Sequence, residues 1–257
     1  DYDRKAILRE ESLLAVMQRA GARVLWLENQ SGCKGVCQGV PYDKLSPGRD
    51  PDLCRGGECF DGAMLEKLKR LDVARDGGLT VVFLHQLGNH GPAYYKRYPA
   101  AFERFKPVCK DERLQNCSRE AIVNAYDNAV LYTDSLLAGA IDWLASRKDL
   151  DTGLLYVSDH GESLGEKGLY LHGAPQLLAP DEQTRVPMTL WLSGGLEARL
   201  GLDEGCLRER AARPASHDML FSTLLALAGV QSAAYEAAKD ATAACRSPDR
   251  AAAAMRR

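Results

Sequence analysis

An apolar run that leads into possible metal ligands places the strongest constraint on the fold. Leu154 to Val157 form a continuous apolar segment, the pattern of a strand that is covered on both faces. Asp159 and His160 follow where that strand should end, and His172 comes after a glycine-rich loop that can fold back. In open α/β sheets the carboxyl ends of the strands line the ligand crevice. We therefore expect this stretch to bring an acid and imidazoles to one site.

Further apolar segments alternate with amphipathic ones along the chain. Ser118, a residue type that favours helix starts, precedes a long apolar stripe at helical spacing. Pro187 confines the last strand to an edge or stands among its first residues. The connections are too long for hairpins, so we predict a three-layer α/β/α sandwich around a mostly parallel sheet. The expected strands cover residues 24–27, 79–84, 154–157 and 186–192, and the expected helices cover residues 1–21, 64–71, 118–147 and 216–229.

Length and charge set the domain organisation and exclude one class of partner. A chain of 257 residues is long enough for one large core, which we assign to residues 1–232. Residues 233–257 are rich in alanine and arginine and predict a loosely ordered tail. With 33 basic and 35 acidic residues the net charge is -2, so nothing indicates a nucleic-acid partner. The sequence shows neither an apolar run of about 18 residues nor an opening signal peptide.

The cysteines indicate an oxidising compartment. Most of the eight cysteines form close pairs in polar, glycine- and proline-rich segments. Zinc binding or free thiols are the alternatives, but none of the close pairs has CxxC spacing. We therefore expect disulfides and a compartment such as the periplasm, and, since no export segment is seen, a mature product or an excised piece. The expected pairs are Cys33–Cys37, Cys54–Cys59 and Cys109–Cys117, with Cys206–Cys245 as a possible fourth.

Histidines and one aspartate that follow the expected strands are candidates for a metal site. His90 lies in a glycine-containing loop after the second strand, and Asp159, His160 and His172 follow the third. A carboxylate with imidazoles suits Zn²⁺ better than Mn²⁺. The alternative is that such residues are hydrogen-bonded structural features at strand ends, an interpretation that applies most directly to His85.

A serine hydrolase is a rival interpretation of the same stretch. Residues 161–165 match the Gly-x-Ser-x-Gly nucleophile elbow, in which Ser163 would attack with His217 and a later aspartate as its partners. The elbow requires its serine on the turn between a strand and a helix. Here the apolar run ends several residues earlier, and glycines interrupt residues 166–173, which do not resemble a helix. A third possibility is a non-catalytic binding module in which the histidines are structural.

Several motifs together resemble one known family. The sequence is similar to the phosphoethanolamine transferases that modify lipid A, a group that includes the mobile colistin-resistance enzymes and belongs to the alkaline phosphatase and sulfatase superfamily. The resemblance extends from about residue 8 to residue 230. Its motifs are Ser-Asp-His-Gly-Glu-Ser-Leu-Gly-Glu (158–166), Tyr-Leu-His-Gly (170–173), His-Gln-Leu-Gly-Asn-His-Gly-Pro-Ala-Tyr-Tyr (85–95), Cys-Lys-Gly-Val-Cys (33–37), Asn-Ala-Tyr-Asp-Asn (124–128) and Val-Pro-Met (186–188).

The resemblance implies a sulfatase-like fold and a zinc-dependent reaction. In the family, phosphoethanolamine passes from phosphatidylethanolamine to a lipid A phosphate through a phosphorylated threonine, which confers polymyxin resistance. By this resemblance Asp159 and His160 hold zinc, with one or two ions in total. His90 and His172 lie at the phosphoryl group or at a second zinc ion, where they stabilise the transferring charge.

The resemblance also implies donor contacts and a missing part. Lys34 and the residue four before it would contact phosphoethanolamine; the family often has asparagine at that earlier position, where this chain has Gln30. The nucleophilic threonine, a glutamate ligand and the transmembrane helices of the family lie upstream. We therefore expect a monomeric carboxyl-terminal part of the catalytic domain at the periplasmic face of the inner membrane, with the N-terminal part missing and without activity alone.

Overall fold

A parallel sheet of three strands forms the centre of the molecule. The computed structural model describes residues 9–48, 54–55, 57–74, 77–175 and 177–247. Strand β1 (Arg23–Glu28) lies between β2 (Tyr42–Lys44) and β5 (Thr80–His85), parallel to both. The sheet places Glu28 opposite His85, so the polar residues at the two carboxyl ends meet.

A second pair of strands carries the stretch that precedes the histidine loop. Strand β6 (Gly153–Val157) pairs with β9 (Met188–Leu192), and the pair is antiparallel. Pro187 stands directly before β9, where its missing N–H removes no ladder hydrogen bond. The hydrogen-bonded ladder of β5 joins it to β1, and that of β6 joins it to β9. All six residues of β5 are only half-buried, unlike the carboxyl half of β1.

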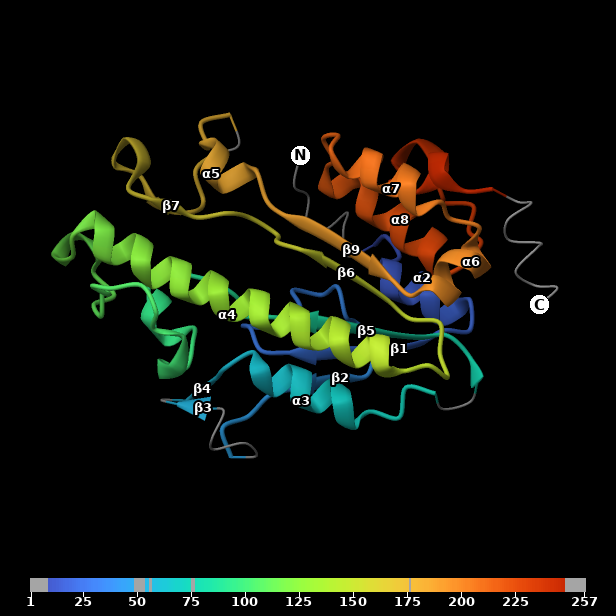
Figure 1. The fold of residues 1–257 in the computed structure, drawn as a ribbon, viewed down its shortest axis with the longest axis horizontal. Coiled ribbons are helices and arrows are strands. Elements are labelled where there is room, and N and C mark those ends of the chain that lie inside the picture. The colour runs from blue at the N-terminus through green and yellow to red at the C-terminus, as the bar shows by residue number, and fades with distance from the viewer. Residues whose placement is uncertain (1–8, 49–53, 56, 75–76, 176, 248–257) are drawn as a thin grey trace.

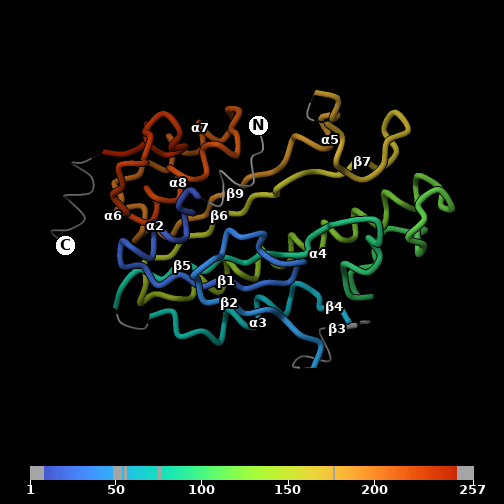
Figure 2. Tube along the Cα trace, turned by 180° about the vertical axis from the view of Figure 1, so that it is seen from behind, coloured from blue at the N-terminus to red at the C-terminus, as the bar shows by residue number. Residues whose placement is uncertain are grey.

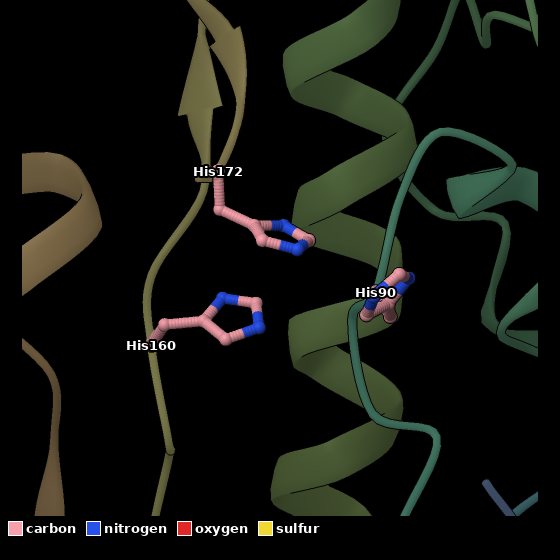
Figure 3. Close-up of side chains that lie close together, drawn as sticks. All are labelled: His90, His160 and His172. Atoms are coloured by element: carbon pink, nitrogen blue, oxygen red, sulfur yellow. The ribbon is translucent and has the colours of Figure 1, made fainter. Parts of the chain in front are cut away.

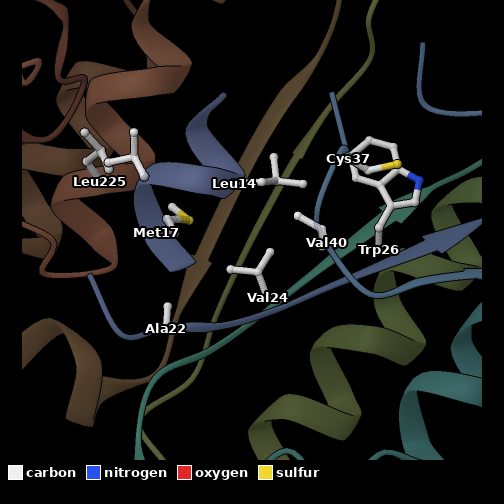
Figure 4. Close-up of a cluster of buried hydrophobic side chains, with 9 residues drawn as sticks. Leu14, Met17, Ala22, Val24, Trp26, Cys37, Val40 and Leu225 are labelled. Carbon is white, nitrogen blue, oxygen red and sulfur yellow. The ribbon is translucent and has the colours of Figure 1, made fainter. Parts of the chain in front are cut away.

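Helices cover both faces of the parallel sheet, as the sequence predicts. Alternate residues of a strand point to opposite faces. Val81 and Phe83 pack with α2 (Leu13–Arg19) and α8 (Leu220–Leu227), whereas Val82 and Leu84 pack towards α3 (Gly62–Arg70). Figure 4 shows the cluster on the α2 and α8 face, where apolar side chains of α2, β1 and α8 meet. The long helix α4 (Arg119–Ser146) contacts α3 and completes the other outer layer (Figure 1).

The helix ends follow the expected signals. The Ser118 hydroxyl accepts a hydrogen bond from the Ala121 amide at 3.2 Å and begins α4, as predicted. Ser12 begins α2 in the same way, and the first residues of the helix expected at 1–21 lie outside the described residues. Ser216 caps a short 3-10 turn (His217–Met219) that leads directly into α8.

Shorter elements lie at the two ends of the molecule. Figure 2 shows the carboxyl-terminal helices beside α2 at one end and the β7 hairpin with α5 at the other. The hairpins are β3 (Cys54–Arg55) with β4 (Glu58–Cys59) and β7 (Ser163–Leu164) with β8 (Tyr170–Leu171); the short helices are α5 (Asp181–Thr184), α6 (Gly194–Leu200) and α7 (Glu204–Ala211).

Disulfides and a buried carboxylate hold the peripheral segments. All four expected cysteine pairs are bonded, including Cys206–Cys245. Asp240 is 2% exposed and accepts hydrogen bonds from the Tyr235 hydroxyl and from Thr242. These contacts fix residues 233–247, which the sequence assigns to a loosely ordered tail. Residues 248–257 lie outside the described part of the chain.

Candidate metal centre

Three histidines from separate loops converge on one point. His90 follows β5, His160 follows β6, and His172 follows β8. Each offers a ring nitrogen, and these atoms lie within 4.8 Å of one another. The His160 and His172 ring centroids are 3.9 Å apart, and that of His90 lies 5.0 Å from His172 and 6.1 Å from His160 (Figure 3). The fold thus unites residues that are up to 82 positions apart, from 90 to 172 in the sequence.

The hydrogen bonds of the three rings leave the same nitrogen open in each. His90 Nδ1 lies 2.8 Å from the Gly91 carbonyl oxygen, and His160 Nδ1 lies 3.0 Å from that of Gly161. His172 Nδ1 lies 3.0 Å from Glu162 Oε1. Because these oxygens accept, each Nδ1 donates, and Nε2 is the nitrogen that a metal ion could bind. Oxygen acceptors behind the ring are the usual support for a metal-binding imidazole. The three side chains therefore fit a Zn²⁺ ion.

Close backbone packing sets the position of His160. Gly161 donates its N–H to the Gln183 carbonyl at 3.0 Å. A Cβ atom at Gly161 would lie 2.0 Å from the Glu182 carbonyl oxygen, which no real contact allows. Glycine at this position lets the chain after β6 pass against α5 and directs His160 to the other two rings.

The structure places Asp159 beside the three histidines rather than among them. Its side chain is 86% exposed, and Oδ2 lies 3.8 Å from His160 Nε2. Its other oxygen accepts a hydrogen bond from the His160 amide at 3.1 Å. The sequence alone offers Asp159, His90, His160 and His172 as one candidate metal site, and the family resemblance implies zinc at Asp159 and His160. Among the described residues, the geometry groups the three histidines.

Glu162 is a buried carboxylate that supports two of the three histidines. It is 7% exposed and accepts hydrogen bonds from the Gly91 amide at 3.2 Å and the Tyr94 hydroxyl at 3.0 Å, besides its contact with His172. Burial, together with the nearby charge of Glu162, raises the pKa of Tyr94 far above its usual range. No sequence pattern assigned a role to Glu162. The available signal was its place in the motif at residues 158–166, two residues after His160.

Asp61 ties the loop of His90 to the end of β1. The buried carboxylate accepts hydrogen bonds from the Asn29 side chain at 2.7 Å and from the amides of Leu87 and Gly88 at 2.9 and 2.7 Å. Burial raises the pKa of Asp61, and these hydrogen bonds oppose that effect in part. Sequence reasoning missed this residue because its partners lie on two distant loops.

Glu28 anchors the loop that contains Gln30 and Lys34. One carboxylate oxygen accepts from the Gln30 amide at 2.6 Å and from the Gly32 amide at 3.2 Å. The other lies 2.8 Å from Trp26 Nε1 and from His85 Nδ1. Burial raises the pKa of Glu28, but the hydrogen bonds outweigh it, so the pKa lies below its ordinary value.

Gln30 and Lys34, the two residues expected to contact phosphoethanolamine, lie on this anchored loop. The Gln30 side-chain oxygen accepts from the Ser31 amide at 3.0 Å. Lys34 has a left-handed backbone with φ of 52°, and its ammonium group contacts the Ser31 hydroxyl at 3.1 Å. The described contacts thus place Gln30 and Lys34 together, on the loop after β1.

Ser163 lacks the surroundings of a nucleophile. Its side chain is completely buried, and its hydroxyl accepts a hydrogen bond from Gln183 Nε2 at 2.8 Å. His217, its expected partner, contacts the Ser158 carbonyl at 2.8 Å instead. The geometry therefore gives no support to the serine hydrolase interpretation.

None of the helices within the described ranges combines the length and the apolar character needed to cross a bilayer.

Comparison with known proteins places the chain in a family. The sulfatase family model matches residues 2–230. The phosphoethanolamine transferase EptA of Salmonella typhimurium is 46% identical over 248 residues, which are 95% of this chain and 45% of that protein. The phosphatidylethanolamine transferase Mcr-1 of Escherichia coli is 41% identical over 74% of this chain and 37% of its own length.

A solved structure gives the same result. The soluble domain of lipooligosaccharide phosphoethanolamine transferase A from Neisseria meningitidis is 44% identical and superposes with a TM-score of 0.90. The match covers 96% of this chain and 75% of that domain. The chain spans less than half the length of the curated relatives named above. From its motifs, its fold and these matches, the chain belongs to the sulfatase family, in the group that includes the phosphoethanolamine transferases.

Proposed function

We propose that this chain is part of a phosphoethanolamine transferase that moves phosphoethanolamine from phosphatidylethanolamine to a phosphate of lipid A. The observation that carries the proposal is the convergence of His90, His160 and His172, each with Nδ1 held by an oxygen atom. The names of the similar proteins supply the reaction class. A centre of this kind binds an anionic phosphoryl group, since the imidazoles or an ion that they hold offset the charge that develops during transfer.

Zinc is the ion that suits these ligands, and one or two ions would complete the site. His160 and Asp159 would hold it, and His90 and His172 would either join them or contact the phosphoryl group. Bound zinc supplies a Lewis acid and lowers the pKa of a coordinated hydroxyl group. Glu162 keeps the His172 ring oriented, and Asp61 holds the loop of His90.

The nucleophile in this proposal is a threonine outside the chain. Among the described strands β5 pairs with β1 alone, and its residues are half-buried. This supports the view, because a further strand beside β5 would cover its apolar side chains. The donor headgroup would contact Lys34 and Gln30 on the loop that Glu28 anchors. Such an enzyme would act as a monomer at the periplasmic face of the inner membrane and would confer polymyxin resistance.

Two measurements test the proposal. Purified protein that contains this chain should bind zinc, as measured by elemental analysis, and His90→Ala, His160→Ala and His172→Ala should each reduce the bound amount. Asp159→Ala decides whether the exposed carboxylate is a ligand. The complete enzyme should transfer phosphoethanolamine to lipid A, as detected by mass spectrometry. Unchanged zinc content in every histidine variant, or the absence of transfer by the complete zinc-loaded enzyme, would contradict the proposal.

A further inference from the structure

Exposed apolar side chains gather on both sides of His172 in the chain. Leu169 and Tyr170 precede it and are 39% and 42% exposed. Leu177 and Leu178 follow it and are 99% and 75% exposed, the highest values among the large apolar side chains that the structure describes. A soluble surface rarely presents neighbouring leucines in this way unless they contact another apolar surface.

The segment around these residues carries no formal charge. Between Lys167 and Asp181 the sequence has no lysine, arginine, aspartate or glutamate, although charged residues make up 26% of the chain. Uncharged, exposed and apolar segments are suited to an environment in which charges would be costly to bury.

A hydrogen-bonded turn presents the two leucines. The amides of Leu178 and Ala179 both donate to the Pro175 carbonyl, at 2.7 and 2.9 Å. In Figures 1 and 2 the β7 hairpin and α5, into which this segment leads, lie on the same side of the molecule. Along the chain, His172 lies between the hairpin and this turn.

We propose that this apolar rim, defined by Leu169, Tyr170, Leu177 and Leu178, docks on a phospholipid bilayer with both leucines in its apolar layer. The inference rests on the proposed function, because it takes the phosphate of a membrane lipid to lie at the three histidines. The glycerol and acyl chains of such a lipid begin one ester bond from that phosphate. The rim therefore stands where a bilayer must approach if the lipid is to reach His172 without leaving the membrane.

A fluorescent probe at the rim tests the contact directly. All eight cysteines are in disulfides, so Leu177→Cys introduces a single thiol for an environment-sensitive dye. On addition of vesicles of phosphatidylethanolamine and phosphatidylglycerol, the emission should shift to the blue and increase. Val130→Cys, at a 41% exposed position on α4, is the matched control and should not respond. No response at position 177 would overturn the inference. A blue-shifted emission before vesicles are added would also overturn it, because a second copy of the chain would then cover Leu177.

Vesicle flotation gives a second, independent readout. The double substitution Leu177→Ser and Leu178→Ser should weaken vesicle binding at least about tenfold, since each leucine loses apolar burial. The double substitution Phe105→Ser and Val130→Ser removes exposed apolar side chains elsewhere and should leave binding unchanged. Equal binding by wild type and the leucine variant, with matching circular dichroism spectra, would refute the docking surface.

The source of any failure can be identified. Glycerophosphoethanolamine has the headgroup but no acyl chains, and its affinity should be the same for wild type and the leucine variant. Normal vesicle docking without transfer by the complete enzyme would count against the proposed function alone. Normal transfer to soluble acceptors without docking would count against the rim alone.

Discussion

His172 Nδ1 lies 3.0 Å from Glu162 Oε1, and the same buried carboxylate accepts the Gly91 amide and the Tyr94 hydroxyl. Glu162 thus orients the imidazole of His172 and also holds Gly91, the residue that follows His90. All three partners donate and the carboxylate oxygens accept, so the contact with Glu162 favours a proton on His172 Nδ1.

We expect Glu162→Gln to weaken zinc binding by about tenfold or more, the usual loss when the support of a metal-binding histidine is removed. The amide keeps the volume of the carboxylate but offers a single acceptor oxygen to three donors. A competition titration against a chromophoric chelator measures the affinity. Glu204→Gln, at the surface pair with Arg208 on α7, is the control. If both variants bound zinc as tightly as wild type, the orienting role of Glu162 would be wrong.

Gly161→Ala should disrupt the centre through the backbone. The added Cβ would lie 2.0 Å from the Glu182 carbonyl oxygen, so the chain beside His160 must move. We expect a lower zinc affinity and a lower melting temperature, measured by titration and by calorimetry. Gly78→Ala is the matched control, because a Cβ there meets no atom within 4 Å and the residue has no left-handed backbone. Equal behaviour of the two variants would show that the loop tolerates the shift.

Local patterns predicted the layers of the fold, while contacts between distant segments escaped them. The apolar run at residues 154–157 and the stripe behind Ser118 depend on side-chain periodicity alone, and both elements form as expected. The antiparallel pairing of β6 with β9 depends on how the chain returns, which periodicity does not encode. The order of residues 233–247 likewise depends on Asp240, whose partners are found only in the folded chain.

The candidate site shows the same division. His90 and His160 could be named as candidates because each follows an expected strand, and His172 because it follows a glycine-rich loop that can fold back. Their supporting residues could not be found in this way. Asp61 directly precedes α3 and resembles an ordinary helix-start residue until its contacts with Leu87 and Gly88 are seen.

Glu28 should make the stability of the protein depend on acid pH. Its pKa in the folded state lies below the ordinary value of 4.5, so folding favours the carboxylate. The resulting stability is present above the unfolded pKa and is lost as the pH falls through the folded pKa. We therefore expect wild type to exceed Glu28→Gln in free energy of unfolding near neutral pH, and the difference to shrink below about pH 4.5.

Urea unfolding at neutral and acid pH measures this difference for Glu28→Gln. Glu120→Gln, at an exposed position in the first turn of α4, is the control and should show a much smaller change between the two conditions. If the difference in free energy of unfolding between wild type and Glu28→Gln grew as the pH fell, the expected role of the Glu28 carboxylate would be contradicted.

The Cys206–Cys245 disulfide should contribute more to stability than Cys33–Cys37, because it closes a longer loop. The bonded cysteines are separated by 39 positions in the first case and by 4 in the second. Loop-closure entropy gives about 4 kcal/mol for the long loop and about 2 kcal/mol for the short one. Urea unfolding of Cys206→Ser with Cys245→Ser, compared with Cys33→Ser with Cys37→Ser, measures the two losses. The long-loop variant should also make residues 233–247 more sensitive to limited proteolysis. Without the covalent link, only the non-covalent contacts of Asp240 hold the segment. The long-loop variant could lose no more free energy of unfolding than the short-loop variant, with residues 233–247 still protected from protease. The contacts of Asp240 alone would then fix the segment.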